Sequence, residues 1–97
     1  MKSDLDLQLQ KTFGNRLKEL RAMQGMTQEE LADAANLFRT YMSRIESGHA
    51  NPSLTVIHSL ASALSVPPGQ LLTPPSQDFV AGAVRSRAPV SRGRISR

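Results

Sequence analysis

The chain has 97 residues, enough for one small domain with an extension but too few for two separate cores. It has no cysteine and no apolar run of about 18 residues, which excludes disulfides, thiolate metal sites, cysteine nucleophiles and a membrane-spanning helix. The formal net charge is +4, and all of it arises from residues 78–97, because residues 1–77 carry seven basic and seven acidic side chains.

The charge pattern predicts a neutral domain with a cationic tail. We expect a polar lead-in over residues 1–11, a helical domain over residues 12–73 and a disordered Arg-rich tail over residues 74–97. The tail opens with Pro74-Pro75 and has too little apolar content to order itself. Acidic residues stand in the first ten positions, where a signal peptide has an apolar stretch, so we expect a cytosolic protein.

The first predicted helix starts between Asp4 and Thr12 and ends at Gly25, which favours a left-handed stop. Its apolar residues recur at steps of three and four on one face: Leu9, Phe13, Leu17, Leu20 and Met23.

Two short helices follow. The second begins at a capping box formed by Thr27 and Glu30, and Asn36 can adopt the left-handed conformation that ends it. The third has apolar residues at every fourth position from Leu37 and ends at Gly48. Two short helices joined by a tight turn and flanked by longer helices are typical of a helix-turn-helix.

The fourth helix begins after the N-cap Ser53 and presents an apolar stripe: Leu54, Ile57, Leu60, Ala61 and Leu64. Residues 67–69, Pro-Pro-Gly, break the chain, and residues 70–72 form one turn of a fifth helix before Pro74. No segment alternates as a strand would, so the sequence predicts an all-α fold.

The motifs of these helices resemble those of the Cro/C1-type (XRE) helix-turn-helix regulators over about residues 12–72. The similarity rests on residues 14–17, 20–21, 25–32, 41–48, 51–53 and 61–66 in that order and spacing. Residues 36–41 are also similar to the restriction–modification controller proteins. The resemblance implies a five-helix, lambda-repressor-like DNA-binding domain whose third helix enters the major groove.

The resemblance also implies a DNA site. Thr27 and Gln28 begin the second helix, whose N-terminal N–H groups face phosphate. Ser47 holds a position that often touches the DNA backbone. On the third helix, the outward positions opposite the apolar stripe are Arg39, Thr40, Ser43 and Arg44. Arginine there can read guanine. A solvated polar face is the alternative for these residues, and Arg44 could pair with an acid such as Glu46.

Arg21 and Glu46 have a structural role in this family. The resemblance implies a partly buried ion pair that ties the first helix to the third, with no direct contact to DNA.

Two features depart from the family pattern. Phe38 stands where relatives have a capping Ser, Thr or Asp, and it could pack under the turn, contact a thymine methyl or lie at an interface. The loop after Gly48 reads His49-Ala50-Asn51, where many relatives carry Lys or Arg. One or two phosphate contacts are then missing or depend on protonation of His49, so modest affinity and salt dependence are expected.

The tail arginines are candidates for non-specific DNA contacts: Arg85, Arg87, Arg92, Arg94 and Arg97. The alternative is a solvated extension that aids solubility. The apolar residues of the tail are too few for stable binding to a membrane surface.

We therefore predict a regulator that binds double-stranded DNA as a homodimer at an inverted repeat, with the dimer surface around the fourth helix and residues 67–72. The alternative is an antitoxin or adaptor whose residues 78–97 bind a protein partner. An enzyme is least supported, because no catalytic constellation or phosphate-binding glycine loop is present. With two histidines and no cysteine, we expect no metal site and no cofactor. Activator and repressor are not distinguished, because that depends on where the operator lies.

Overall fold

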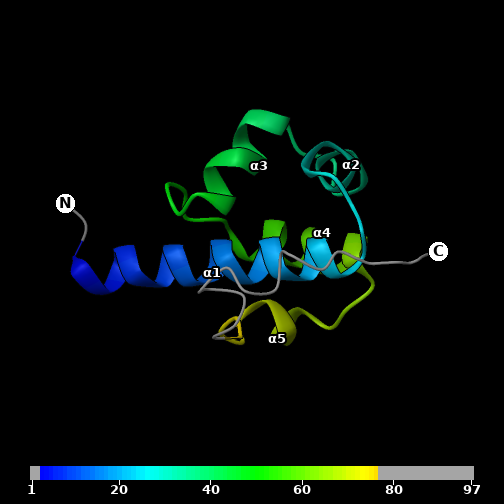
Figure 1. Ribbon diagram of the computed structural model, residues 1–97. Coiled ribbons are helices and arrows are strands. Elements are labelled where there is room, and N and C mark those ends of the chain that lie inside the picture. The colour runs from blue at the N-terminus through cyan, green and yellow to red at the C-terminus, as the bar shows by residue number, and fades with distance from the viewer. Residues whose placement is uncertain (1–2, 77–97) are drawn as a thin grey trace.

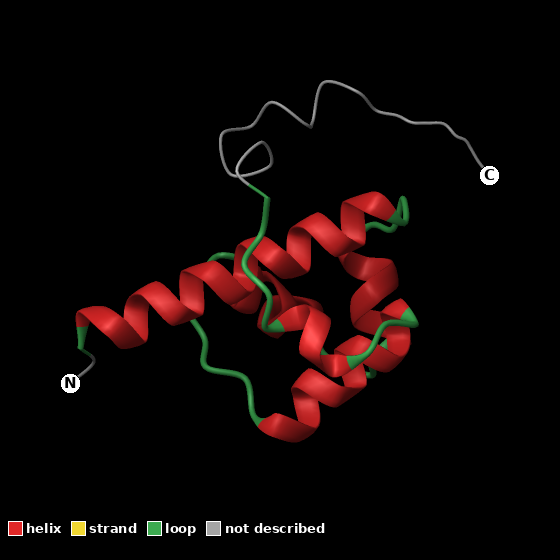
Figure 2. Cartoon of the chain, turned by 90° about the horizontal axis from the view of Figure 1, so that it is seen from below, coloured by secondary structure: helices red, strands yellow, loops and turns green. Residues whose placement is uncertain are grey.

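Five helices make up residues 3–76, the part of the chain that this computed structural model describes. They are α1 (Asp4–Met23), α2 (Gln28–Ala34), α3 (Arg39–Glu46), α4 (Leu54–Leu64) and α5 (Pro68–Leu71). The long α1 crosses the molecule, with α2 and α3 above it and α5 below it (Figure 1). Short loops join the helices, and the described part contains no strand (Figure 2). The all-α prediction is confirmed.

Polar side chains begin three of the helices. The N–H of Asp6 donates to the Ser3 hydroxyl at 3.1 Å, so α1 begins at Asp4, and residues 4–11 of the expected lead-in belong to this helix. Thr27 and Glu30 form the predicted capping box on α2, with bonds of 2.8 and 3.0 Å. Ser53 accepts the N–H of Val56 at the start of α4, as predicted. Each cap satisfies N–H groups that have no partner inside the helix.

Left-handed residues follow four helices, α1 to α4, and Gly25 after α1 has φ 67°, as its position predicted. Asn36 has φ 60° and Gly48 has φ 83°, as their positions predicted. The sequence predicts a break at residues 67–69, whereas α4 ends at Leu64, the last residue of its apolar stripe, with Ser65 at φ 58°. Pro68 then begins α5 instead of interrupting the chain, since proline suits the first turn of a helix.

One face of each helix is buried in a single hydrophobic core. Its fully buried large side chains are Leu17, Leu31, Met42, Ile45, Leu60, Leu64 and Leu71. The predicted stripe of α1 is buried only in its middle, because Leu9 and Met23 at its ends are 59% and 72% exposed. The first two turns of α1 therefore extend beyond the core.

Gly14 marks the closest approach of α1 to α3. A Cβ built on this glycine would lie 2.5 Å from the carbonyl oxygen of Ile45 and 2.6 Å from that of Glu46. Only a hydrogen at this position lets the two backbones approach so closely, and this contact places α3 on the outside of the domain.

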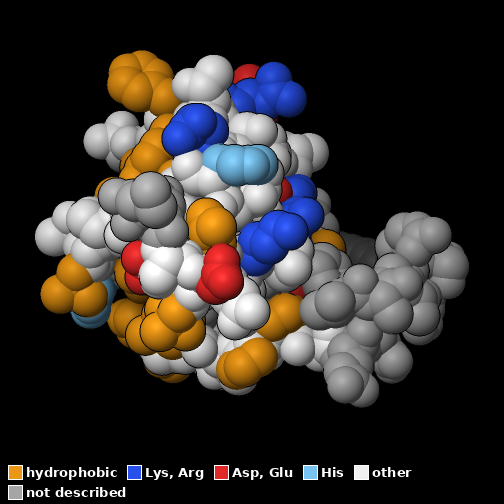
Figure 3. All heavy atoms as spheres, turned by 90° about the vertical axis from the view of Figure 1, so that its left-hand side faces the viewer, with side chains coloured by type: hydrophobic (Ala, Val, Ile, Leu, Met, Phe, Trp, Pro, Cys, Tyr) orange, Lys and Arg blue, Asp and Glu red, His pale blue; other side chains and the backbone are white. Residues whose placement is uncertain are grey.

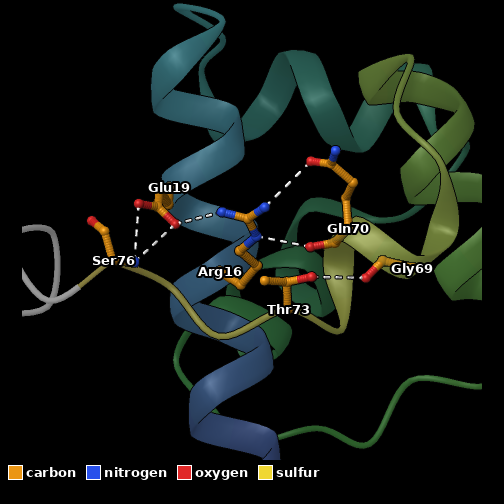
Figure 4. A network of polar contacts seen from close by, with 6 residues as sticks. All are labelled: Arg16, Glu19, Gly69, Gln70, Thr73 and Ser76. Atoms are coloured by element: carbon orange, nitrogen blue, oxygen red, sulfur yellow. Dashed lines mark hydrogen bonds and ion pairs between the residues drawn. The ribbon is translucent and has the colours of Figure 1, made fainter.

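A polar network fastens α5 and the segment after it to α1 (Figure 4). Arg16 donates to the backbone carbonyl of Gln70 at 2.8 Å and forms an ion pair with Glu19, also at 2.8 Å. The backbone N–H of Ser76 donates to the Glu19 carboxylate at 3.2 Å. Burial acts to raise the pKa of Glu19, but the hydrogen bonds from Arg16 and Ser76 outweigh it and hold that pKa below its ordinary value.

No helix within residues 3–76 is both long enough and apolar enough to cross a bilayer. The five tail arginines named above lie outside the described residues.

Candidate nucleic-acid interface

The outer face of α3 carries the polar side chains that the sequence assigned to DNA. Met42 and Ile45 anchor the inner face in the core. Arg39, Thr40 and Ser43 are exposed on the opposite side, and their side chains form no hydrogen bond or ion pair with any other residue in 3–76. These donors are therefore available to a ligand.

Phe38 lies at the start of this face and is 85% exposed. It is the N-cap residue of α3 and supplies no side-chain hydrogen bond to the helix. Packing under the turn, one of the three alternatives considered for Phe38, is contradicted by this exposure. The ring is placed where it can contact an apolar group of a partner, such as a thymine methyl.

Arg21 and Glu46 form a two-pronged ion pair between α1 and α3. Arg21 Nε donates to Glu46 Oε2 at 2.7 Å, and Nη2 donates to Oε1 at 2.9 Å. The third guanidinium nitrogen donates to the carbonyl of Met26 at 2.9 Å, which fixes the turn before α2. Glu46 is 3% exposed, so the charge pair is largely desolvated and both partners need each other.

Gln28 joins the same network. Its Nε2 donates to Glu46 Oε1 at 3.0 Å. This hydrogen bond to the last residue of α3 fixes the orientation of the Gln28 side chain. A glutamine that only begins a helix would point into solvent. One amide N–H and the amide oxygen remain for a ligand. Neighbouring Thr27 is exposed, and its hydroxyl caps α2 as an acceptor while keeping its own O–H for donation.

The turn after α3 holds two further residues predicted to contact DNA. Arg44 is exposed and donates to the carbonyl of His49 at 2.7 Å; no side-chain acid pairs with it within residues 3–76. Ser47 donates to the carbonyl of Arg44 at 3.1 Å, and its oxygen lies 2.9 Å from His49 Nδ1. Both side chains stabilise the turn and remain at the surface beside the exposed face of α3.

These residues share one face of the molecule. Figure 3, which faces the N-terminal end of α1, shows Lys, Arg and His side chains over its upper and central part, with acidic side chains among them and hydrophobic side chains at the upper left and below. An exposed short helix with unpartnered donors suits the edges of bases and the phosphates of DNA.

Comparison with known protein families also identifies a helix-turn-helix in this part of the chain. The helix-turn-helix family model matches residues 17–71, more than half of the chain.

This chain belongs to the Cro/C1-type (XRE) helix-turn-helix family of transcriptional regulators.

Three relatives illustrate the range of this helix-turn-helix family. The immunity repressor protein of Bacillus phage phi105 is 42% identical over 55 residues, which are 57% of this chain but only 38% of the repressor. The control protein C.BamHI of Bacillus amyloliquefaciens is 43% identical over 61 residues, 62% of this chain and 75% of that protein. The crystal structure of the restriction-modification controller protein C.AhdI from Aeromonas hydrophila matches with a TM-score of 0.63 and 44% identity, covering 64% of this chain and 94% of that one.

The helix-turn-helix motifs indicate α2 and α3 but do not include Lys11 of α1, which the fold brings to the end of α3. Lys11 is exposed and packs its stem against Gly48, immediately after α3. Its position was assigned to the lead-in, ahead of the matched motifs. The signal that could have found it is the helical register of α1, since Lys11 lies three residues before Gly14, which meets the end of α3. Within residues 3–76, no group of three His, Asp or Glu side chains could hold a metal ion.

Proposed function

We propose that this protein is a sequence-specific regulator that reads an inverted-repeat operator in the major groove as a homodimer. The observation that carries the proposal is the exposed face of α3, where Arg39, Thr40 and Ser43 have no partner within residues 3–76 while the opposite face is anchored in the core. Side chains on a rigid helix are held in place for base recognition, and an arginine can donate two hydrogen bonds to guanine.

The hydrogen bonds that hold α3 against α1 and α2 support this function. Glu46 links α3 to Arg21 of α1 and to Gln28 of α2 within 3.0 Å. We propose that Gln28, oriented in this way, donates its remaining N–H to a phosphate or base beside the one that α3 reads. Thr27, Arg44 and Ser47 then contribute phosphate contacts from the two ends of the helix-turn-helix.

A single recognition helix offers too few base contacts to select one site in a genome, which favours a dimer. Two copies of α3 in a symmetric dimer would read half-sites about one helical turn, or 34 Å, apart. We propose that the dimer surface lies around α4 and α5, where Leu54 and Leu72 are 70% and 67% exposed. Beside them, a groove of about 220 Å³ is lined by residues that include Leu9, Pro52 and Ile57. Exposed apolar surface of this kind marks protein contacts.

The tail supplies a further proposal. Five arginines within residues 78–97 can add salt-dependent attraction to phosphates without changing which sequence is read. The last described residue, Ser76, donates its backbone N–H to Glu19 of α1 at 3.2 Å.

The experiment that tests the proposed function is selection from a randomised duplex library with the full-length protein at near-physiological salt. We expect enrichment of an inverted repeat, which establishes sequence recognition and two-fold symmetry together. Sedimentation of the protein with the selected duplex then gives the number of copies bound. A library without enrichment, with only weak salt-sensitive retention, contradicts operator recognition and favours an interaction module whose residues 78–97 bind a protein.

A further inference from the structure

The turn after α3 is a poor phosphate site on its own. It follows a helix C-terminus, where the backbone dipoles leave a partial negative charge. Its residues 47–50, Ser-Gly-His-Ala, include no lysine or arginine. Arg44 lies next to the turn, but one of its guanidinium nitrogens already donates to the carbonyl of His49 at 2.7 Å. A phosphate at this end of α3 therefore needs a second cation.

The imidazole of His49 is already engaged within the turn. The Ser47 hydroxyl has one proton, and this proton is donated to the carbonyl of Arg44 at 3.1 Å. His49 Nδ1 lies 2.9 Å from the same hydroxyl oxygen, so one nitrogen of the ring is held by the turn.

Lys11 lies against this turn from α1. A Cβ built on Gly48 would be 2.8 Å from Lys11 Cγ and 3.1 Å from its Cα, so the lysine stem covers the glycine directly. Lys11 is exposed and forms no ion pair within residues 3–76. No acid stands three or four residues away on the helix, because those positions are Leu7, Gln8, Gly14 and Asn15. Its charge is therefore uncompensated.

The dimensions of α3 place this lysine near the edge of a DNA groove. A helix of eight residues is about 12 Å long, and the major groove is also about 12 Å wide. When the outer face of α3 contacts base edges, the end of the helix at Gly48 reaches the phosphates that border the groove. The stem of Lys11, whose Cγ covers Gly48, lies at the same end of α3.

We propose that Lys11 contacts a DNA phosphate at the C-terminal end of α3 and supplies the cation that the following turn lacks. This inference rests on the proposed function, since it places DNA against α3. It assigns the N-terminal half of α1 a binding role as well as a structural one. The contact is to the backbone and so adds affinity without sequence preference.

The test is the salt dependence of DNA binding by full-length Lys11→Gln, measured on the selected duplex and on a randomised duplex. One lost phosphate contact lowers the slope of log K against log salt by about 0.9 on both duplexes. We expect affinity near 100 mM salt to fall about tenfold at most, with the preferred sequence unchanged. Lys11→Arg, which keeps the charge, should retain the wild-type slope.

Met23→Glu is the matched control, because it lowers the net charge by the same amount at the other end of α1, where Met23 is 72% exposed. Thermal unfolding followed by circular dichroism should show that each variant folds. A slope that is unchanged in Lys11→Gln, or lowered equally by Met23→Glu, overturns the inference.

The proposed operator recognition and the proposed Lys11 contact can be contradicted separately. If the wild type binds DNA without sequence preference and Lys11→Gln still lowers the salt slope, the phosphate contact is supported and operator recognition is contradicted. If the wild type retains no DNA at all, both fall.

Discussion

Gln28, the first residue of α2, donates its side-chain N–H to the carboxylate of Glu46, the last residue of α3, over 3.0 Å. The same carboxylate accepts two N–H groups of Arg21 from α1. One buried acid therefore sets the relative positions of three helices, and a change at Glu46 should affect folding and DNA binding together.

Glu46→Gln should lower the free energy of unfolding by about 2–4 kcal/mol, because it leaves the mostly buried Arg21 without its anionic partner. Urea unfolding measures this loss. In the double variant Arg21→Gln, Glu46→Gln, no charge remains unpaired, so we expect a smaller loss than the sum of the two single changes. Strictly additive losses would show that the two side chains do not depend on each other.

Arg39→Ala should relax the preference at one base position of the operator by roughly 10- to 100-fold, while binding to random DNA falls little. Competition binding with operator variants measures both quantities. Arg39→Lys should also lose the preference, because an ammonium group cannot donate the paired hydrogen bonds of a guanidinium. Equal loss on every sequence would mean that Arg39 contacts only phosphate.

Gly14→Ala should destabilise the domain by about 3 kcal/mol, since the added methyl group meets backbone carbonyls of α3 that cannot move aside. Thermal or urea unfolding gives the value. Gly69→Ala is the control, because a Cβ there has no neighbour within 4 Å, and its effect should be near zero or slightly stabilising. Equal effects of the two substitutions would contradict the close helix crossing.

The hydrogen bonds to Glu19 should make stability depend on pH in the acid range. The pKa of Glu19 is lower in the folded protein than its ordinary value of 4.5. The stabilisation is therefore fully present above about pH 4.5 and is lost as pH falls through the lower folded pKa. Unfolding curves between pH 3 and pH 7 should show this loss in the wild type and a flatter profile in Glu19→Gln. Profiles of equal steepness would assign the acid sensitivity to other carboxylates.

Deletion of residues 78–97 should flatten the salt dependence of DNA binding by several units, because five arginines are removed. The sequence preference should stay the same, since residues 3–76 contain the whole helix-turn-helix. Binding titrations at four salt concentrations measure the slope. An unchanged slope would show that the tail does not contact DNA.

The helix starts and stops were predictable because they depend on local chemistry. Thr27 with Glu30, Ser53, Asn36 and Gly48 each act through backbone groups a few residues away, so their residue types alone indicate the boundary. Ser65 was missed because serine seldom adopts a left-handed conformation, and nothing local distinguishes it from the serines inside α4.

The parts of the site that were not predictable depend on tertiary contacts. The bond from Gln28 to Glu46 joins residues 18 positions apart. Lys11 is brought to Gly48 only because α1 begins early enough, at Asp4, to extend past the end of α3. The pairing of Arg21 with Glu46 was predicted from the family resemblance alone, because no periodicity in the sequence indicates it.

The exposed Phe38 has a consequence for the dynamics of α3. Thr27 caps α2 with an oxygen, whereas Phe38 offers none, so the first amide groups of α3 are left to water. The amide proton of Tyr41, which holds the position in α3 that Glu30 holds in α2, should therefore exchange with deuterium faster than the capped amide of Glu30. The first turn of α3, which carries Arg39, therefore lacks the side-chain cap that the first turns of α1, α2 and α4 have, and this lets it adjust when a ligand binds.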